Sequence, residues 1–228
     1  ELCYNANNGE RMKKNFAVIF DLDVTLLNTD LLIQKSFEHV FKRYKPDYQI
    51  SDEEHLSFLG PTLKETFSRY FPDDMIDELI EYYREYNHKH HQDYVTIYPH
   101  IRETLKTLKQ KGYPLAVVTT KYRQAAYIGL DLFDLTNYFD MVLGMNDVQH
   151  VKPHPEGIVK VMQTLACNRG LYIGDNITDI MAGKNAGIYT AGVKWTPKGY
   201  EILEKLVPDL MIDDMQDIIT FVERVSEE

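Results

Sequence analysis

Cysteine is scarce in this sequence of 228 residues, which contains two, Cys3 and Cys167. Two cysteines cannot supply a disulfide framework, so a disulfide-stabilised secreted fold is excluded and a reduced, cytoplasmic setting is expected. No apolar run approaches the ~18 residues of a transmembrane helix, so such a helix is excluded. Basic residues are also few, 25 against 35 acidic ones, and the net charge of −10 argues against nucleic acid or an anionic membrane as a partner.

The first residues of the chain are expected to lie outside the fold. Met12-Lys13-Lys14 looks like a natural start of translation, which makes residues 1–11 an N-terminal extension. The apolar stretch that follows, Phe16–Phe20, is ended by Asp21. It is shorter than the about 7–15 residues that the apolar region of a secretory signal needs, so such a signal is not predicted.

Short apolar runs rich in β-formers alternate with amphipathic helical patterns along most of the chain, and 44% apolar with 26% charged residues is a globular balance. The runs are nearly continuous in apolar character, as in parallel strands that are covered on both faces. They comprise residues 16–20, 115–118, 141–143, 171–173, 188–193 and 210–212. The alternation predicts an α/β fold with a Rossmann-like parallel sheet.

One stretch breaks this alternation, from about Thr29 to about Tyr98, where no strand is expected. Apolar residues recur there with helical spacing in the segments 33–44, 63–71 and 76–86. The sequence therefore predicts a core of residues 13–28 and 97–226, with an α-helical insertion of residues 29–96. Both linkers of the insertion leave the core near Asp21, so the insertion is expected to close over that end of the sheet.

Polar residues suited to phosphate and metal chemistry follow several predicted strands. In a parallel α/β sheet, ligands bind beyond the carboxyl ends of the strands. The segments found there are Asp21-Leu22-Asp23-Val24-Thr25, Thr119-Thr120-Lys121, Val151-Lys152-Pro153 and Gly174-Asp175-Asn176-Ile177-Thr178-Asp179. Converging carboxylates need a compensating charge, and Mg²⁺ prefers oxygen ligands, so this composition suits a divalent cation together with a phosphate.

These segments resemble, in order, the four motifs of the haloacid dehalogenase (HAD) superfamily: Asp-x-Asp-x-Thr, a hydroxyl residue, a lysine, and Gly-Asp-x-x-x-Asp. The resemblance spans Asp21 to Asp179 and implies a HAD-like core with an inserted α-helical cap. Two shorter segments, 59–61 and 195–199, are similar to the phosphoglycolate phosphatase and pyrophosphatase branch. The resemblance thus implies a Mg²⁺-dependent phosphohydrolase whose partner is a small phosphorylated metabolite.

The resemblance also implies a role for each matching residue. Asp21 is the implied nucleophile that forms an aspartyl-phosphate, and Asp23 is the implied general acid and base. Thr119 and Lys152 are implied to stabilise charge on the phosphate and the nucleophile. The implied Mg²⁺ ligands are Asp21, the backbone carbonyl of Asp23, and Asp175, with Asp179 as a support or water-mediated ligand.

Further residues are expected near the substrate. Thr25 supports the nucleophile loop, Thr120 follows Thr119, and Gly60 lies between two cap helices, where glycine permits close approach of the backbone to a ligand. A simple interhelical turn explains Gly60 equally well. Val24 departs from the glycine that is usual in the family. Because a β-branched residue tolerates positive φ poorly, the turn after Asp23 is expected to have φ below zero at Val24.

Other interpretations of these residues stay open. A sugar-phosphate mutase of the same superfamily uses the same pair of aspartates and a similar cap. A phospho-aspartate receiver module also combines acidic residues, threonine and lysine, but it is shorter and lacks the helical insertion. His88 and His91, three residues apart, could form a zinc site, although the polar end of a helix is the preferred interpretation. The sequence carries no signal for an oligomeric state.

Overall fold

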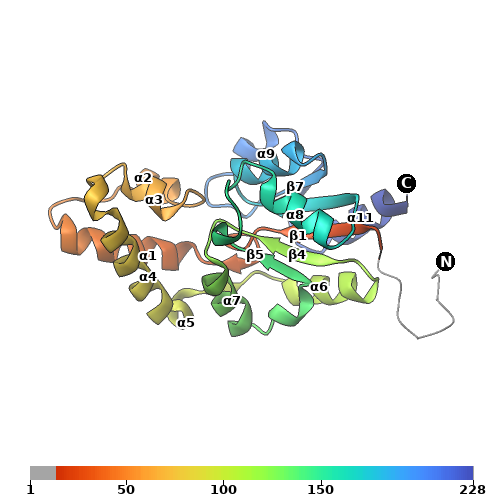
Figure 1. The fold of residues 1–228 in the computed structure, drawn as a ribbon, viewed down its shortest axis with the longest axis horizontal. Helices are drawn as coiled ribbons and strands as arrows, with labels where there is room; N and C mark the ends of the chain where they lie inside the picture. The colour runs from red at the N-terminus through yellow and green to blue at the C-terminus, as the bar shows by residue number, and fades with distance from the viewer. Residues whose placement is uncertain (1–13, 228) are drawn as a thin grey trace.

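A six-stranded sheet of parallel strands, in the order β5-β4-β1-β6-β7-β8, forms the centre of the core (Figure 1). The structure is a computed structural model that describes residues 14–227, so the predicted extension, residues 1–11, and Cys3 lie outside the described residues. The strands are β1 (Phe16–Phe20), β4 (Leu115–Val118), β5 (Met141–Leu143), β6 (Arg169–Gly174), β7 (Tyr189–Val193) and β8 (Leu210–Ile212). All six predicted strands and the α/β fold class are confirmed.

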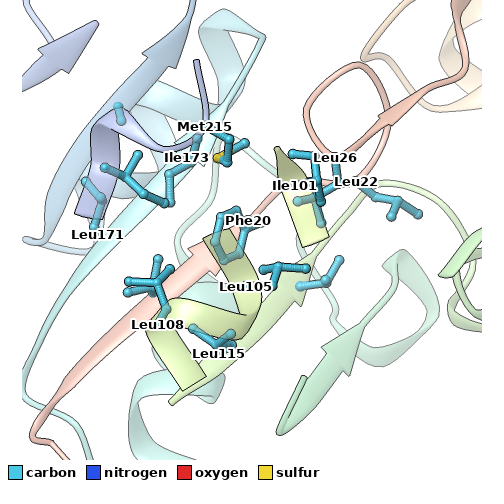
Figure 2. Close-up of a cluster of buried hydrophobic side chains, with 14 of the residues drawn as sticks. Phe20, Leu22, Leu26, Ile101, Leu105, Leu108, Leu115, Leu171, Ile173 and Met215 are labelled. Carbon is cyan, nitrogen blue, oxygen red and sulfur yellow. The ribbon is translucent and has the colours of Figure 1, made fainter. Parts of the chain in front are cut away.

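Helices cover both faces of this sheet because the side chains of β1 alternate between two apolar clusters. Phe16, Val18 and Phe20 pack on one face, and Ala17 and Ile19 on the other. The first face is covered by α6 (Ile101–Gln110), α7 (Arg123–Leu132) and α11 (Asp217–Glu227), and the second by α8 (Glu156–Thr164) and α9 (Ile177–Asn185). Figure 2 shows the first cluster, with Phe20 surrounded by leucine and isoleucine side chains. The covered faces explain why the strands are apolar throughout.

The segment between β1 and β4 folds mainly into helices, which lie together at one end of the molecule (Figure 1). These are α1 (Asp30–Tyr44), α2 (Asp52–Ser57), α3 (Leu63–Phe67), α4 (Ile76–Lys89) and α5 (His91–Tyr94). The first, third and fourth were predicted. Their apolar side chains form a cluster of their own, which includes Phe37, Phe58, Phe67 and Tyr83. The division at residues 28/29 and 96/97 stays a prediction, and "cap" below denotes residues 29–96.

Four short helical segments complete the described chain. They are α10 (Glu201–Glu204) and the 3-10 helices η1 (Asp73–Met75), η2 (Thr136–Tyr138) and η3 (Met145–Asp147). Within residues 14–227, no helix is long and apolar enough to span a membrane.

The expectation that residues 29–98 contain no strand was wrong at one point. Strand β3 (Thr96–Ile97) pairs antiparallel with β2 (Leu27–Asn28). Each strand has two residues, too few for a periodic pattern in the sequence. The linkers that enter and leave the cap therefore lie side by side, and β2 begins six residues after Asp21.

Val24 is a second correction, because its φ is +59° rather than negative. The loop around it is fixed by backbone hydrogen bonds: Val24 N–H donates to the Leu27 carbonyl at 2.7 Å, and the Val24 carbonyl accepts from Trp195 Nε1 at 3.0 Å. The side chain is 1% exposed, so it is also fixed by packing. These contacts hold a valine in a left-handed conformation that costs about 1–2 kcal/mol.

We expect Val24→Gly to unfold within about 1 kcal/mol of the wild type, because relief of the left-handed strain offsets much of the lost burial of about 1.5–3 kcal/mol. Val24→Ala keeps the strain and loses burial, so it is expected to be the less stable variant. Urea unfolding of both, with Val117→Ala in β4 as the control for buried valine, checks this. A Val24→Gly variant less stable than Val24→Ala would contradict it.

Candidate active site

Three buried carboxylates meet at the carboxyl ends of β1 and β6. Asp21 directly follows β1, Asp175 directly follows β6, and Asp179 lies in the first turn of α9. One carboxylate oxygen of each lies within 4.8 Å of those of the other two. Their exposed fractions are 6%, 4% and 0%, respectively. The predicted convergence of strand ends therefore brings these three residues together.

Lys152 lies among these carboxylates and is itself 9% exposed. Its Nζ donates a hydrogen bond to Asp179 Oδ1 at 2.6 Å. The same Nζ lies 2.8 Å from Asp21 Oδ1, with which it forms an ion pair. One lysine thus neutralises part of a cluster of three acids, and the cluster retains excess negative charge.

Asp179 has both carboxylate oxygens engaged by the protein. Oδ1 accepts from Lys152, and Oδ2 accepts from the Asn176 backbone N–H at 2.9 Å in a capping box at the start of α9. Gly174 allows this close packing, because a Cβ there would lie 2.3 Å from Asp179 Cβ. Asp179 is therefore placed to hold Lys152 and the helix end.

The electrostatics of the cluster follow from its burial. Burial raises the pKa of Asp175 well above its usual value, and the neighbouring Asp179 and Asp21 raise it further. Burial also raises the pKa of Asp21, to about 7, by more than Lys152 lowers it. The two acidic neighbours raise the pKa of Lys152 against the effect of burial. Clustered, buried oxygen donors of this kind fit a hard divalent cation, which would relieve their mutual repulsion.

We expect the protein in EDTA to lose stability as pH rises from about 4 to about 7. The folded pKa of Asp21, about 7, exceeds its ordinary value of 3.8, so over this window the folded state keeps a proton that the unfolded state has released. The stabilising contribution of Asp21 is therefore greatest below this window and is lost through it. Excess Mg²⁺ is expected to flatten the slope because bound cation replaces the proton.

Thermal unfolding across this pH range, with EDTA and with Mg²⁺, measures that slope. Asp21→Asn serves as the comparison, because removal of the group should make the slope in EDTA shallower. Identical slopes for the wild type and Asp21→Asn would show that Asp21 does not titrate in this window.

Asp23 differs from Asp21 in its surroundings. Its side chain is 21% exposed, and Lys121 Nζ donates to its Oδ1 at 2.7 Å. Burial alone would raise the pKa of Asp23, but the charge and hydrogen bond of Lys121 lower it. The pKa values of two carboxylates two residues apart are thus shifted in opposite directions, because burial dominates at Asp21 and Lys121 dominates at Asp23.

The predicted threonines follow the strands β4 and β1, which pair with each other. Thr119 is 5% exposed, and its Oγ1 accepts from the Lys121 backbone N–H at 3.2 Å, which leaves its hydroxyl proton for another acceptor. Thr25 is fully buried, and its Oγ1 has no hydrogen-bond partner among residues 14–227. Both side chains therefore keep donor capacity at the strand ends.

The loop that carries Gly60 touches the core above the acids. The Gly60 carbonyl accepts from Thr120 Oγ1 at 3.3 Å, and the Leu59 carbonyl accepts from Asn176 Nδ2 at 3.2 Å and from Lys198 Nζ. Gly60 has φ +101°, and a Cβ there would lie 2.0 Å from Asn176 Nδ2. Glycine at position 60 thus lets the backbone of this loop approach Asn176 of the core closely, and it also lines the cavity.

A cavity of about 240 Å³ lies between cap and core. Asp21, Asp23 and Asp175 line it from the core, together with Lys121 and Thr120. Helix α4 and the Gly60 loop line it from the cap, so a molecule bound at Asp21 would contact both parts.

Some residues of this site were not given a role by the sequence. Lys121 stands beside Thr119 and Thr120, and its position at a strand end was the available signal. Asn176 and Lys198 reach the cap only through tertiary contacts, which no local pattern reports. His88 and His91, the candidate zinc pair, are not in a cluster suited to a metal within the described part of the chain.

Comparison with known proteins gives concordant matches. A sequence model of the haloacid dehalogenase-like hydrolases matches residues 18–193. The chain is 46% identical over 210 residues to a pyrophosphatase, PpaX, from Bacillus cereus, covering 91% of this chain and 96% of that relative. A Clostridium acetobutylicum structure described as a predicted phosphatase aligns with a TM-score of 0.81 at 26% identity, covering 93% of this chain and 100% of the other. A haloacid dehalogenase-like family hydrolase from Streptococcus pneumoniae shares the fold, with a TM-score of 0.80 at 24% identity over 90% of this chain and 97% of that one.

Proposed function

The chain belongs to the haloacid dehalogenase-like hydrolases, and from this membership we propose that it removes a phosphoryl group from a small, soluble phosphate ester or from pyrophosphate. The observation that carries the proposal is the placement of Asp21. It lies beside Lys152 and Asp175 and opens into a cavity that the cap covers. The similarity to a pyrophosphatase over nearly the whole chain supports pyrophosphate as a candidate substrate.

We assign the covalent chemistry to Asp21 and Asp23. An Asp21 carboxylate oxygen bonds to phosphorus while the bond from phosphorus to the leaving oxygen breaks, and Asp23 gives that oxygen its proton. Asp23 then takes a proton from a water molecule, whose oxygen attacks the phosphorus of the aspartyl-phosphate. Inorganic phosphate leaves, and Asp21 is restored. The division follows the family resemblance. Without a cation, burial favours the protonated form of Asp21 and Lys121 favours the ionised form of Asp23, so a cation beside Asp21 would be needed to keep the nucleophile ionised.

Neighbouring donors stabilise the negative charge of the phosphoryl group. Lys152 holds a positive charge 2.8 Å from Asp21 Oδ1, where it neutralises the nucleophile and the attached phosphoryl oxygens. Thr119 donates its hydroxyl proton to a phosphoryl oxygen, and Thr25 supports the loop that follows Asp21. Thr120 borders the substrate and holds the Gly60 loop.

A Mg²⁺ ion would be held by Asp21, the Asp23 backbone carbonyl and Asp175. When bound, it would supply positive charge that polarises the phosphoryl group. Asp179 is assigned a supporting place, because Lys152 and Asn176 occupy its oxygens. A cytoplasmic location and a small phosphorylated metabolite as partner belong to the same proposal.

The test is a panel of pyrophosphate, phosphoglycolate, a sugar phosphate and p-nitrophenyl phosphate, each with Mg²⁺ and with excess EDTA. We expect phosphate release from at least one of these substrates with Mg²⁺ and its loss in EDTA. Undiminished release in EDTA would contradict the metal assignment. An isomerised sugar phosphate without phosphate release would identify a mutase instead.

A further inference from the structure

We propose that Arg84 and His88 of the cap, with Lys121 facing them from the core, form a subsite for a negatively charged leaving group. The substrate would then carry a second anionic group, phosphate or carboxylate, beyond the phosphoryl group that is transferred. This inference rests on the proposed function, since it concerns what occupies the far end of the same cavity.

Helix α4 presents one face to the cavity. The residues that line the cavity from this helix recur at intervals of three and four: Asp77, Ile80, Tyr83, Arg84, Asn87 and His88. Arg84 and His88 are four residues apart, so their side chains are neighbours on that face. Both also line a shallow groove on the outside of the cap, which places them at the mouth of the cavity.

Arg84 is held in place by contacts with core and cap. Its guanidinium lies 3.8 Å from the centre of the Tyr122 ring, which belongs to the core. Its Nη1 donates to Glu81 at 2.9 Å. A guanidinium has five N–H donors, so this bond leaves donors for a second anion. The stacking on Tyr122 reduces the freedom that binding would otherwise cost.

Acidic and basic groups line different parts of the cavity. The acids Asp21, Asp23 and Asp175 lie at the strand ends, whereas Arg84 and His88 lie at the mouth, where Glu78, Glu81 and Glu85 line the outer groove beside them. Lys121 also lines the cavity, and its Nζ donates a hydrogen bond to Asp23 at the strand ends. Burial lowers the pKa of His88, and the charges of Lys121 and Arg84 lower it further, against the opposite effect of Glu81. Among the lining residues of the cap, Asp77 is the acidic exception, and it is exposed.

Apolar side chains make up much of the remaining lining, among them Phe37, Phe58 and Tyr83, together with polar ones such as Thr62, Lys64 and Asn87. The apolar surfaces offer few partners for the several hydroxyl groups of a sugar. They also lower the local dielectric, which strengthens the attraction between the basic groups and a single compact anion.

The experiment compares kcat/KM for pyrophosphate, whose leaving group is anionic and polar, with kcat/KM for p-nitrophenyl phosphate, whose leaving group is aromatic. In Arg84→Met, the ratio of the pyrophosphate value to the p-nitrophenyl phosphate value is expected to fall about 10- to 100-fold, because charge-assisted hydrogen bonds are lost. His88→Ala is expected to lower the same ratio less, by about 3- to 10-fold, since it is a neutral donor at pH 7.

Arg43→Met is the matched control. Arg43 is also a cap arginine stacked on a tyrosine, Tyr82, at 4.9 Å from the ring centre. It lines the outer groove with Arg84 but does not line the cavity. It should leave both kcat/KM values unchanged. Tyr122→Leu removes the stacking partner of Arg84 and keeps the cation. It is expected to lower the ratio as well, but less than Arg84→Met does.

The outcomes distinguish the two proposals. If the wild type hydrolyses p-nitrophenyl phosphate but Arg84→Met leaves the ratio unmoved, the anion subsite is wrong and the phosphohydrolase stands. A ratio that falls equally in Arg43→Met also overturns the subsite, since the effect would then be one of the overall charge of the cap. If the wild type releases phosphate from neither substrate nor from the rest of the panel, the proposed function fails first.

Discussion

Asp21→Asn is expected to lower phosphate release by at least ~10⁴-fold, with an unchanged far-ultraviolet circular dichroism spectrum. An amide is nearly the same size as a carboxylate but cannot act as an anionic nucleophile toward phosphorus. The fold should persist because Lys152 keeps its 2.6 Å hydrogen bond to Asp179 after Asp21 loses its charge. Removal of one of three clustered acids also reduces their repulsion, so the unfolding temperature in EDTA should not fall.

Asp30→Asn is the control for this variant. Asp30 lies at the start of α1 and does not line the cavity, so its amide variant should keep wild-type turnover. Phosphate release is measured on the best substrate of the panel, with folded protein confirmed by circular dichroism. Substantial turnover by folded Asp21→Asn would rule out the aspartyl-phosphate pathway and leave direct attack by water as the mechanism to test.

Much of the core could be predicted because its signals are local. A strand buried on both faces is apolar along its whole length, and β1, β4 and β8 have the predicted bounds. The rule that parallel strands end at one edge then placed Asp21, Asp175 and Thr119 together without any contact being known. The motif resemblance ordered the same residues independently, and the family match spans all of them.

The parts that the sequence missed depend on contacts between distant segments. Val24 adopts φ +59° because Leu27 and Trp195 fix its backbone groups, and Trp195 is far away in the chain. Strand β3 exists because β2 lies beside it. Helix α2 did carry a local signal, the capping box of Ser51 and Glu54, although its six residues bury no side chain and show no apolar stripe.

Contacts between cap and core were the least predictable part. Sequence periodicity assigns Arg84 to a face of α4 but cannot say that Tyr122 and Lys121 lie opposite it. Lys198 lies far along the chain from Leu59, whose carbonyl it binds. These pairs decide what the cavity can accept, which is why the sequence supports the chemistry at phosphorus more strongly than the identity of the leaving group.

Lys152→Met is expected to destabilise the metal-free protein by about 3–5 kcal/mol and to abolish turnover. The side chain of Lys152 is 5% exposed and neutralises two carboxylates, Asp21 at 2.8 Å and Asp179 at 2.6 Å. Removal of one partner from a buried ion pair leaves an uncompensated buried charge, the costliest outcome for such a pair. Methionine fills a similar volume, so the loss comes from charge more than from packing.

Urea unfolding in EDTA measures this loss. Lys160→Met on α8 is the control, because Lys160 is 43% exposed and its ion pair with Glu156 should be worth less than about 1 kcal/mol.

The double variant Lys152→Met/Asp179→Asn tests whether unpaired charge causes the loss. If unpaired charge is responsible, removal of the Asp179 charge should restore part of the lost stability, and Mg²⁺ should restore part of it in Lys152→Met alone. Stability that neither change restores would assign the loss to packing around Tyr172, whose ring centre lies 5.7 Å from Lys152 Nζ. Recovery of stability without recovery of turnover is the expected result, because a relieved charge cluster still lacks the ammonium group beside the nucleophile.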